Sequence, residues 1–407
     1  MYKIFRNITI LILIVYFILA FSSSYLSLSI DNLAYVLAIG VDTSDNNKLK
    51  VTFEFSTTTT ASESVSSEKT SPVLNSVEAS SISNAINLMN SYMGKQINMS
   101  HCKIIIFSEE LAYQGISDEI YTLFNDTQVR PSANIIISKC DAQTYLQESN
   151  PELESLLSKY YEILTNSSSY TGYTPKATIG NFFHGLICQN CQPYAILGGI
   201  NEKKADNSSS INPDKDSDIK SNETTFEGEN GAENIGVAVF KDDKLVGELN
   251  AIETICFLSI KNNVDRFLIS VPDPLKDGNY LDIYISPYGS PDISIDTSTT
   301  SPYVKIDLKF SGRIYSMSTD SKYSDPKVLD TISDNCNSYL ESAYSSLLYK
   351  TSKEFKSDIF ELGENALSNF LTTQEVNNYN WLNNYENAFF NVNVDTSVKS
   401  GMLITET

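Results

Sequence analysis

The apolar residues of this chain are spaced in two different ways, and this mixture restricts the fold more than any other feature of the sequence. Residues 49–55 alternate between apolar and polar side chains, which is the spacing of a half-buried strand. A continuous apolar run at residues 33–41 precedes them across a polar turn, so the two stretches are predicted to form a hairpin. Similar patterns predict further strands at residues 102–107, 134–138, 235–240, 244–249, 303–310 and 389–394.

Other stretches place apolar residues three and four positions apart, which is typical of an amphipathic helix. Ser108 is a good helix N-cap and Gly115 a good stop for the short helix between them. Helices are also predicted at residues 82–89, 116–124, 151–165 and 326–370. The sequence therefore predicts an α+β protein of mixed sheets with flanking helices, and its 407 residues suggest two or three domains at about 150 residues each.

Residues 201–234 interrupt this pattern. They are rich in Ser, Asp, Glu and Asn and nearly free of large apolar residues, so they cannot bury enough surface to offset their chain entropy. We interpret them as a flexible acidic linker or insertion. It would separate an N-terminal α/β region at residues 31–200, expected to hold two subdomains, from a C-terminal α/β domain at residues 235–407.

The first 30 residues are predicted to be a signal or anchor segment. Lys3 and Arg6 precede the apolar run Ile8–Phe21, which predicts a cytoplasmic N-terminus and an exported remainder. A run of about fourteen residues suits a signal peptide, whereas a spanning helix needs about twenty and would have to continue to Leu28.

The end of this segment decides how the protein is attached. Cleavage near the serines at 22–24 is feasible, but we favour an uncleaved helical anchor, because the apolar run reaches about twenty residues if the serines and the following residues to Leu28 enter the membrane boundary, where Tyr25 suits the interface. A lipid linked through a thioether is excluded, because no cysteine precedes Cys102.

The net charge of −21 disfavours nucleic-acid partners and anionic lipid headgroups, so membrane attachment has to come from the apolar segment. His101 and His184 are the only histidines, which removes most general-base and metal-site architectures. His101 precedes an apolar strand, where a structural role is favoured over catalysis. We find no phosphate loop, nucleotide-binding glycine pattern or nucleophile elbow, so no catalytic residue and no cofactor is predicted.

One cluster of side chains could carry chemistry. His184, Cys188 and Cys191 have a spacing at which three soft ligands could meet in a zinc site, and Cys-x-x-Cys is also the spacing of redox dithiols. The pair follows a helical pattern, however, and the dipole at a helix C-terminus disfavours a thiolate. An ordinary buried pair or a local disulfide is therefore favoured over a metal or redox site. The other cysteines in apolar stretches, Cys102, Cys256 and Cys336, are interpreted as small buried hydrophobes.

Four stretches together resemble one known family. They are DNLAYVLAIGVDTSDNNKLKVTFEFS at 31–56, HCKIIIFSEELAYQGISDEIYTLFNDTQVRPSANIIISK at 101–139, GVAVFKDDKLVGELNAIET at 236–254, and FFNVNVDTSVKSG at 389–401 after Trp381. In order and spacing they are similar to the Ger(x)C family, the C subunits of bacterial spore germinant receptors.

The resemblance implies an exported, membrane-attached and non-enzymatic protein of three α/β domains. Such subunits lie on the extracytoplasmic face of the spore inner membrane and act with integral-membrane A- and B-type subunits in the response to nutrient germinants. The chain departs from the family pattern in two ways: serines 22–24 stand where a lipidated cysteine is usual, and the stretch at 201–234 is longer.

Two other classes of protein are alternatives to this resemblance. An extracytoplasmic solute-binding protein would need a deep cleft between two lobes, and the acidic surface would suit cationic ligands. A secreted redox enzyme would use Cys188 and Cys191 and is the weaker of the two alternatives.

Overall fold

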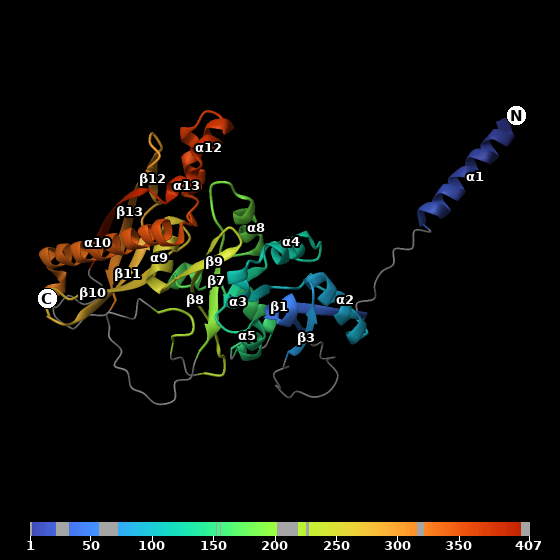
Figure 1. Ribbon diagram of the computed structural model, residues 1–407, viewed down its shortest axis with the longest axis horizontal. Coiled ribbons are helices and arrows are strands. Elements are labelled where there is room, and N and C mark those ends of the chain that lie inside the picture. Colours follow the sequence, from blue (N-terminus) through green and yellow to red (C-terminus); the bar gives the residue numbers. More distant parts are fainter. Residues whose placement is uncertain are drawn as a thin grey trace.

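The computed structural model describes residues 2–21, 32–56, 72–151, 153–154, 156–201, 219–224, 228–315 and 321–399. Within these residues, nine strands form one sheet and five form a second, and helices flank both (Figure 1). The prediction of an α+β protein with mixed sheets and flanking helices is therefore confirmed.

The first sheet is mixed. Its strands are β1 Leu33–Ser44, β2 Lys48–Phe55, β3 Val73–Ala79, β4 Gln96–Asn98, β5 Ile104–Ser108, β6 Asn134–Ser138, β7 Tyr194–Ile200, β8 Ala232–Lys241 and β9 Lys244–Leu249. They lie in the order β3-β2-β1-β5-β6-β7-β8-β9, and β4 pairs with β1. The central strands β1, β5, β6 and β7 are parallel, and antiparallel pairs extend the sheet on both sides.

The predicted hairpin at residues 33–55 is the pair β1 and β2, in which Val41 lies opposite Val51. The five residues of β5 and the five of β6 are all buried, which explains why these strands read as continuous apolar runs. The hydroxyl of Ser108 accepts from the backbone N–H of Leu111, so the helix expected after β5 begins where the sequence predicts.

The helices of the first region are α2 Ile82–Met93, α3 Glu109–Gln114, α4 Ser117–Asn125, α5 Ala142–Glu148, α6 Leu157–Ile163, α7 Ser168–Thr171 and α8 Ile179–Ile187. The helix predicted at residues 151–165 is wrong for its first half, because α6 begins only at Leu157. Leu153 is 98% exposed and Leu156 66% exposed, so these leucines do not form the expected apolar face.

The second sheet is built around one long strand. Its strands are β10 Phe267–Pro272, β11 Tyr280–Pro287, β12 Asp292–Asp296, β13 Tyr303–Ile314 and β14 Phe389–Lys399. One edge of β13 pairs first with β12 and then with β11, and its other edge pairs in parallel with β14. Among the described strands, β14 therefore lies at the edge of this sheet.

Two helices connect the sheets to each other. Helix α9, Ala251–Ile260, is buried at every position except Glu253 and contacts β8, β9 and α10. Its capping box joins Asn250 and Glu253. Helix α10, Pro326–Tyr349, contacts α9, β10 and β14 and so covers one face of the second sheet (Figure 1).

The predicted single helix at residues 326–370 is wrong beyond Tyr349. A π-helical turn follows at Lys350–Phe355, and Lys356 adopts a left-handed conformation (φ 53°) that ends the helix. The remaining helices are α11 Leu362–Ala366, α12 Thr373–Tyr379 and α13 Trp381–Tyr385, and short non-α turns lie at Asp45–Asn47, Ser321–Ser324 and Leu367–Asn369.

Side chains of α10 occupy the free edge of β14. Ser333, Asn337 and Glu341 accept hydrogen bonds from the backbone N–H groups of Val398 (3.2 Å), Thr396 (2.8 Å) and Val394 (3.0 Å). The match is geometric, because four residues of helix rise about 6 Å and two residues of strand about 6.6 Å. We call these three side chains the edge ladder.

Part of the predicted linker at residues 201–234 is packed. The Ser221 hydroxyl is buried and donates to the carbonyls of Leu197 (2.9 Å) and Ile235 (3.1 Å), and Ile219 O accepts from Ala251 N. These residues are therefore tied to β7, β8 and α9. The rest of the predicted linker, at residues 202–218 and 225–227, lies outside the described residues.

The N-terminal segment forms helix α1, Tyr2–Phe21. Its large apolar side chains are exposed from Tyr2 (85%) to Phe17 (62%), and Figure 1 draws the helix apart from both sheets. Of the helices in the described part of the chain, none combines the length and apolar character required to cross a membrane. The possible continuation of α1 to Leu28 falls on residues outside that part.

Candidate functional site

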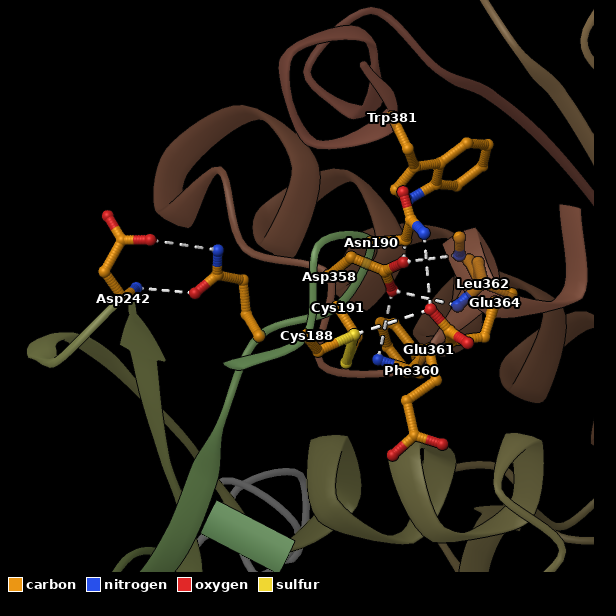
Figure 2. Close-up of a disulfide and its surroundings, with 12 residues drawn as sticks. Cys188, Asn190, Cys191, Asp242, Asp358, Phe360, Glu361, Leu362, Glu364 and Trp381 are labelled. Atoms are coloured by element: carbon orange, nitrogen blue, oxygen red, sulfur yellow. Dashed lines mark hydrogen bonds between the residues drawn. A yellow bond between two sulfur atoms is a disulfide. The ribbon is translucent and has the colours of Figure 1, made fainter. Parts of the chain in front are cut away.

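The cluster singled out in the sequence lies at the C-terminal end of α8. His184 is exposed in the last turn of this helix, and Cys188 and Cys191, which follow it, are joined by a disulfide with a Cα–Cα distance of 5.5 Å (Figure 2). This is the local disulfide that the sequence left open. Within the described residues, no group of three or more His, Cys, Asp or Glu side chains is placed to hold a metal ion.

The disulfide loop packs against the first turn of α11, Leu362–Ala366. Asn190 Nδ2 donates to Glu364 Oε1 (3.3 Å), and the Cys188 sulfur lies 3.5 Å from the same oxygen (Figure 2). A Cβ on Gly363 would lie 2.2 Å from the backbone oxygen of Asn190 and 2.4 Å from a ring carbon of Trp381. Only glycine at position 363 allows the disulfide loop and α11 to approach this closely.

Asp358 organises the other side of this contact. Its carboxylate is buried and accepts from Trp381 Nε1 (2.8 Å) and from the backbone N–H groups of Gly363 (2.8 Å) and Leu362 (3.3 Å). Burial raises the pKa of Asp358 to about 6, although these donors favour the charged form. The carboxylate thus ties the loop before α11 to the sole tryptophan of the chain.

A third set of hydrogen bonds extends the contact to the β8–β9 hairpin. Gln192 N donates to Asp358 O (2.9 Å), and its side chain donates to Asp242 Oδ1 (3.3 Å) and accepts from Asp242 N (2.5 Å) (Figure 2). The disulfide loop therefore bridges the hairpin and the loop before α11. We call residues 188–192, 358–364 and Trp381 the junction cluster.

The junction cluster has the features of a structural joint. Its acids are bound by N–H donors, its two cysteines are oxidised, and His184 is exposed on α8. The sequence indicated Cys188 and Cys191, but it missed Asp358, Gly363 and Glu364. Those residues are about 170 positions away in the chain, and nothing in a single sequence indicates that they meet the disulfide loop.

The remaining residues singled out in the sequence have packing roles. The ring of His101 lies edge-on to Tyr35, with 4.8 Å between the ring centroids. Cys102, Cys256 and Cys336 are buried as predicted, and burial raises the pKa of the Cys102 thiol to about 12. These thiols are therefore protonated at neutral pH.

Comparisons with known proteins agree with this architecture. Residues 27–197 match the family model described as spore germination protein N-terminal domain, and residues 235–401 match the one described as spore germination B3/GerAC like, C-terminal. No protein with a curated description matches the chain.

A solved structure titled "Crystal Structure of the GerBC protein" has a similar fold, with a TM-score of 0.51 and 14% sequence identity. The match covers 88% of this chain and 96% of that one. With both halves matched in order, the chain belongs to the Ger(x)C family, the C subunits of spore germinant receptors.

Proposed function

We propose that this protein is the non-enzymatic C subunit of a nutrient-germinant receptor, held on the extracytoplasmic face of the spore inner membrane by its N-terminal segment. It acts there with integral-membrane A- and B-type subunits to trigger germination. The observation that carries the proposal is the apolar surface of α1, whose large side chains are 48–85% exposed and would be covered by lipid or by membrane partners.

The junction cluster suggests how a C subunit could pass on a signal from its partners. It joins the region before residue 200 to the region after residue 350 through the hydrogen bonds from Asn190 to Glu364 and from Gln192 to Asp358, and buried hydrogen bonds hold Asp358 in place. A displacement imposed on one region would then be transmitted to the other, because packed contacts of this kind do not deform freely.

An extracytoplasmic solute-binding protein is the alternative. Such a protein would work with a transporter and would not require the A- and B-type subunits. The family membership favours the receptor subunit.

The test is a deletion of residues 2–21 in spores that carry an epitope-tagged chain. We expect the truncated protein to leave the membrane fraction, the A- and B-type subunits to be lost from its immunoprecipitate, and nutrient germination to fail. The matched control is Asp334→Ala, on the exposed side of α10 and outside the junction cluster, which should leave membrane attachment and germination intact. A truncated protein that still supports nutrient germination would contradict the proposal.

A further inference from the structure

Three aromatic rings lie against one another where α4 contacts α8, and all three are partly exposed to solvent (Figure 1). Phe124 stacks on Phe183 with 3.9 Å between the ring centroids, and Tyr121 stands edge-on to Phe183 at 5.3 Å. Ile187 lies one turn further along α8, on the same side as Phe183, and is 55% exposed. We call Tyr121, Phe124, Phe183 and Ile187 the aromatic patch.

The aromatic patch is separate from the residues that hold these helices on the protein. Helix α4 buries Ile120 and Leu123, and helix α8 buries Ile179 and Phe182. The side of a surface helix that faces away from the core normally carries polar residues. Adjoining exposed tyrosine and phenylalanine rings are instead typical of surfaces that contact another protein.

The start of α4, beside the aromatic patch, is acidic. Asp118 is exposed and lies one turn before Tyr121 on the same helix. Burial raises the pKa of Glu119, and the charges of Asp118 and Asp243 raise it further. In the described part of the chain, none of these three acids forms an ion pair with a lysine or arginine. A cation placed beside Asp118 would therefore relieve a repulsion that the folded chain leaves in place.

These charges decide which occupant fits the patch. A second copy of this chain, related by a two-fold axis, would bring the same acids against each other, and anionic lipid headgroups would be repelled. A helix with one apolar face and flanking lysine or arginine residues would match both the rings and the acids. We propose that the aromatic patch docks a basic amphipathic helix of an integral-membrane A- or B-type subunit.

This inference rests on the proposed function, which supplies the partner subunits, and adds the surface and the chemistry of the contact. The position of the patch connects it to the junction cluster, because Ile187 directly precedes Cys188 in the chain. A helix bound to the patch would therefore contact the last turn of α8, from which the disulfide loop continues.

The first test is photocrosslinking in spores that carry the epitope-tagged, full-length chain. Benzoylphenylalanine replaces Tyr121 or Ile187 and, as the control, Tyr288, which follows β11 and is 74% exposed. We expect the first two positions, but not the control, to crosslink to one A- or B-type subunit. The crosslinked segment should have apolar residues three and four apart and at least two lysines or arginines. Crosslinks only to lipid or to a second copy of this chain, a segment without basic residues, or yields no higher than the control would overturn the proposal.

The second test reverses the charge beside the patch. Asp118→Lys with Ile187→Lys changes two exposed positions, and we expect the A- or B-type subunit recovered by immunoprecipitation of the chain to fall at least fivefold at equal chain level. Asp334→Lys with Tyr288→Lys adds the same charges at exposed positions elsewhere and should leave the recovery unchanged. Equal recovery from both pairs would contradict the proposal. Asp118→Lys alone gives the same comparison if the double variant does not accumulate.

A charge exchange completes the test. Replacement of a basic residue in the crosslinked segment by Glu should restore recovery by Asp118→Lys to at least half of the wild-type level, and no restoration would count against a contact between the two charges. The two proposals fail in different ways. A wild-type chain that recovers no A- or B-type subunit would refute the proposed function, whereas equal recovery by the wild type and the patch variants would refute only this inference.

Discussion

At the scale of single residues, Glu54 is the most unusual, because its acidic side chain is buried although a carboxyl group favours water or a hydrogen-bond partner. It lies on β2, next to the edge strand β3 of the first sheet, and has no exposed surface; neither carboxylate oxygen has a hydrogen-bond partner among the described residues. Burial raises the pKa of Glu54 to about 8, and the neighbouring Tyr161 hydroxyl offsets this only in part. The folded protein therefore holds a neutral Glu54 at pH 7.

Glu54 makes stability depend on pH in a defined direction. Its pKa is 4.5 in the unfolded chain and about 8 in the folded one, so between these values only the folded state keeps the proton. The free energy of unfolding then falls as pH rises from about 4.5 to 8, by up to about 1.4 kcal/mol per pH unit, and levels off above that range. Glu54→Gln, which cannot ionise, should remove this slope.

The measurement is urea unfolding of wild type and Glu54→Gln at pH 5, 6, 7 and 8. The difference between them is expected to grow with pH in favour of the variant. Parallel curves would mean that Glu54 is charged in the folded state.

Asp358 is a buried acid of the opposite kind, because donors surround it. Asp358→Ala would leave Trp381 Nε1 and the N–H of Gly363 buried without an acceptor, at a cost of about 2–4 kcal/mol in the free energy of unfolding. The fluorescence of Trp381 should shift to the red in the same variant. Asp277→Ala, at an exposed position, is the control and should change neither quantity.

At the scale of elements, the edge ladder of α10 gives a direct test. Asn337→Leu removes the acceptor of Thr396 N without changing the helix, and we expect a loss of about 1–3 kcal/mol in the free energy of unfolding. Hydrogen exchange at Thr396 should become faster. Asp334→Ala on the exposed side of α10 should leave both unchanged, and unaltered exchange at Thr396 in Asn337→Leu would show that the ladder does not protect β14.

The elements also show what a single sequence can and cannot predict. The hairpin of β1 and β2, the buried strands β5 and β6 and the alternating β14 were all predicted, because their periodicity is local. The end of α10 was missed, because the apolar residues Phe355 and Ile359 keep helical spacing although the α-helix has already ended at Tyr349. Their burial is decided by contacts that the spacing does not reveal.

The same distinction between local patterns and long-range contacts applies to the candidate site. The spacing of Cys188 and Cys191 allowed a local disulfide, which needs only neighbouring residues. The contacts of this disulfide loop with Asp358 and Glu364, and the aromatic patch of α4 and α8, form only where segments distant in the sequence meet. The spacing of residues in the sequence does not predict such contacts.

At the scale of the whole molecule, the stretch at residues 202–218 should be dispensable for folding. Its polar composition cannot form a core, and shortening a loop changes closure entropy only by about 0.6 kcal/mol per halving of its length. Replacement of these residues by a short Gly/Ser linker should leave the melting temperature nearly unchanged. The same replacement of residues 219–224, which include the buried Ser221, should lower it clearly, and equal effects would contradict the distinction.

The position of β8 and β9 has a consequence for how genes of this family can exchange parts. The second family match begins at residue 235, yet β8 and β9 complete the first sheet and α9 is buried against them. A crossover at that border would place two foreign strands beside the β7 of the recipient chain. Chimeric subunits built there should aggregate or fail to accumulate, whereas a crossover after α9, near residue 262, would carry each sheet whole.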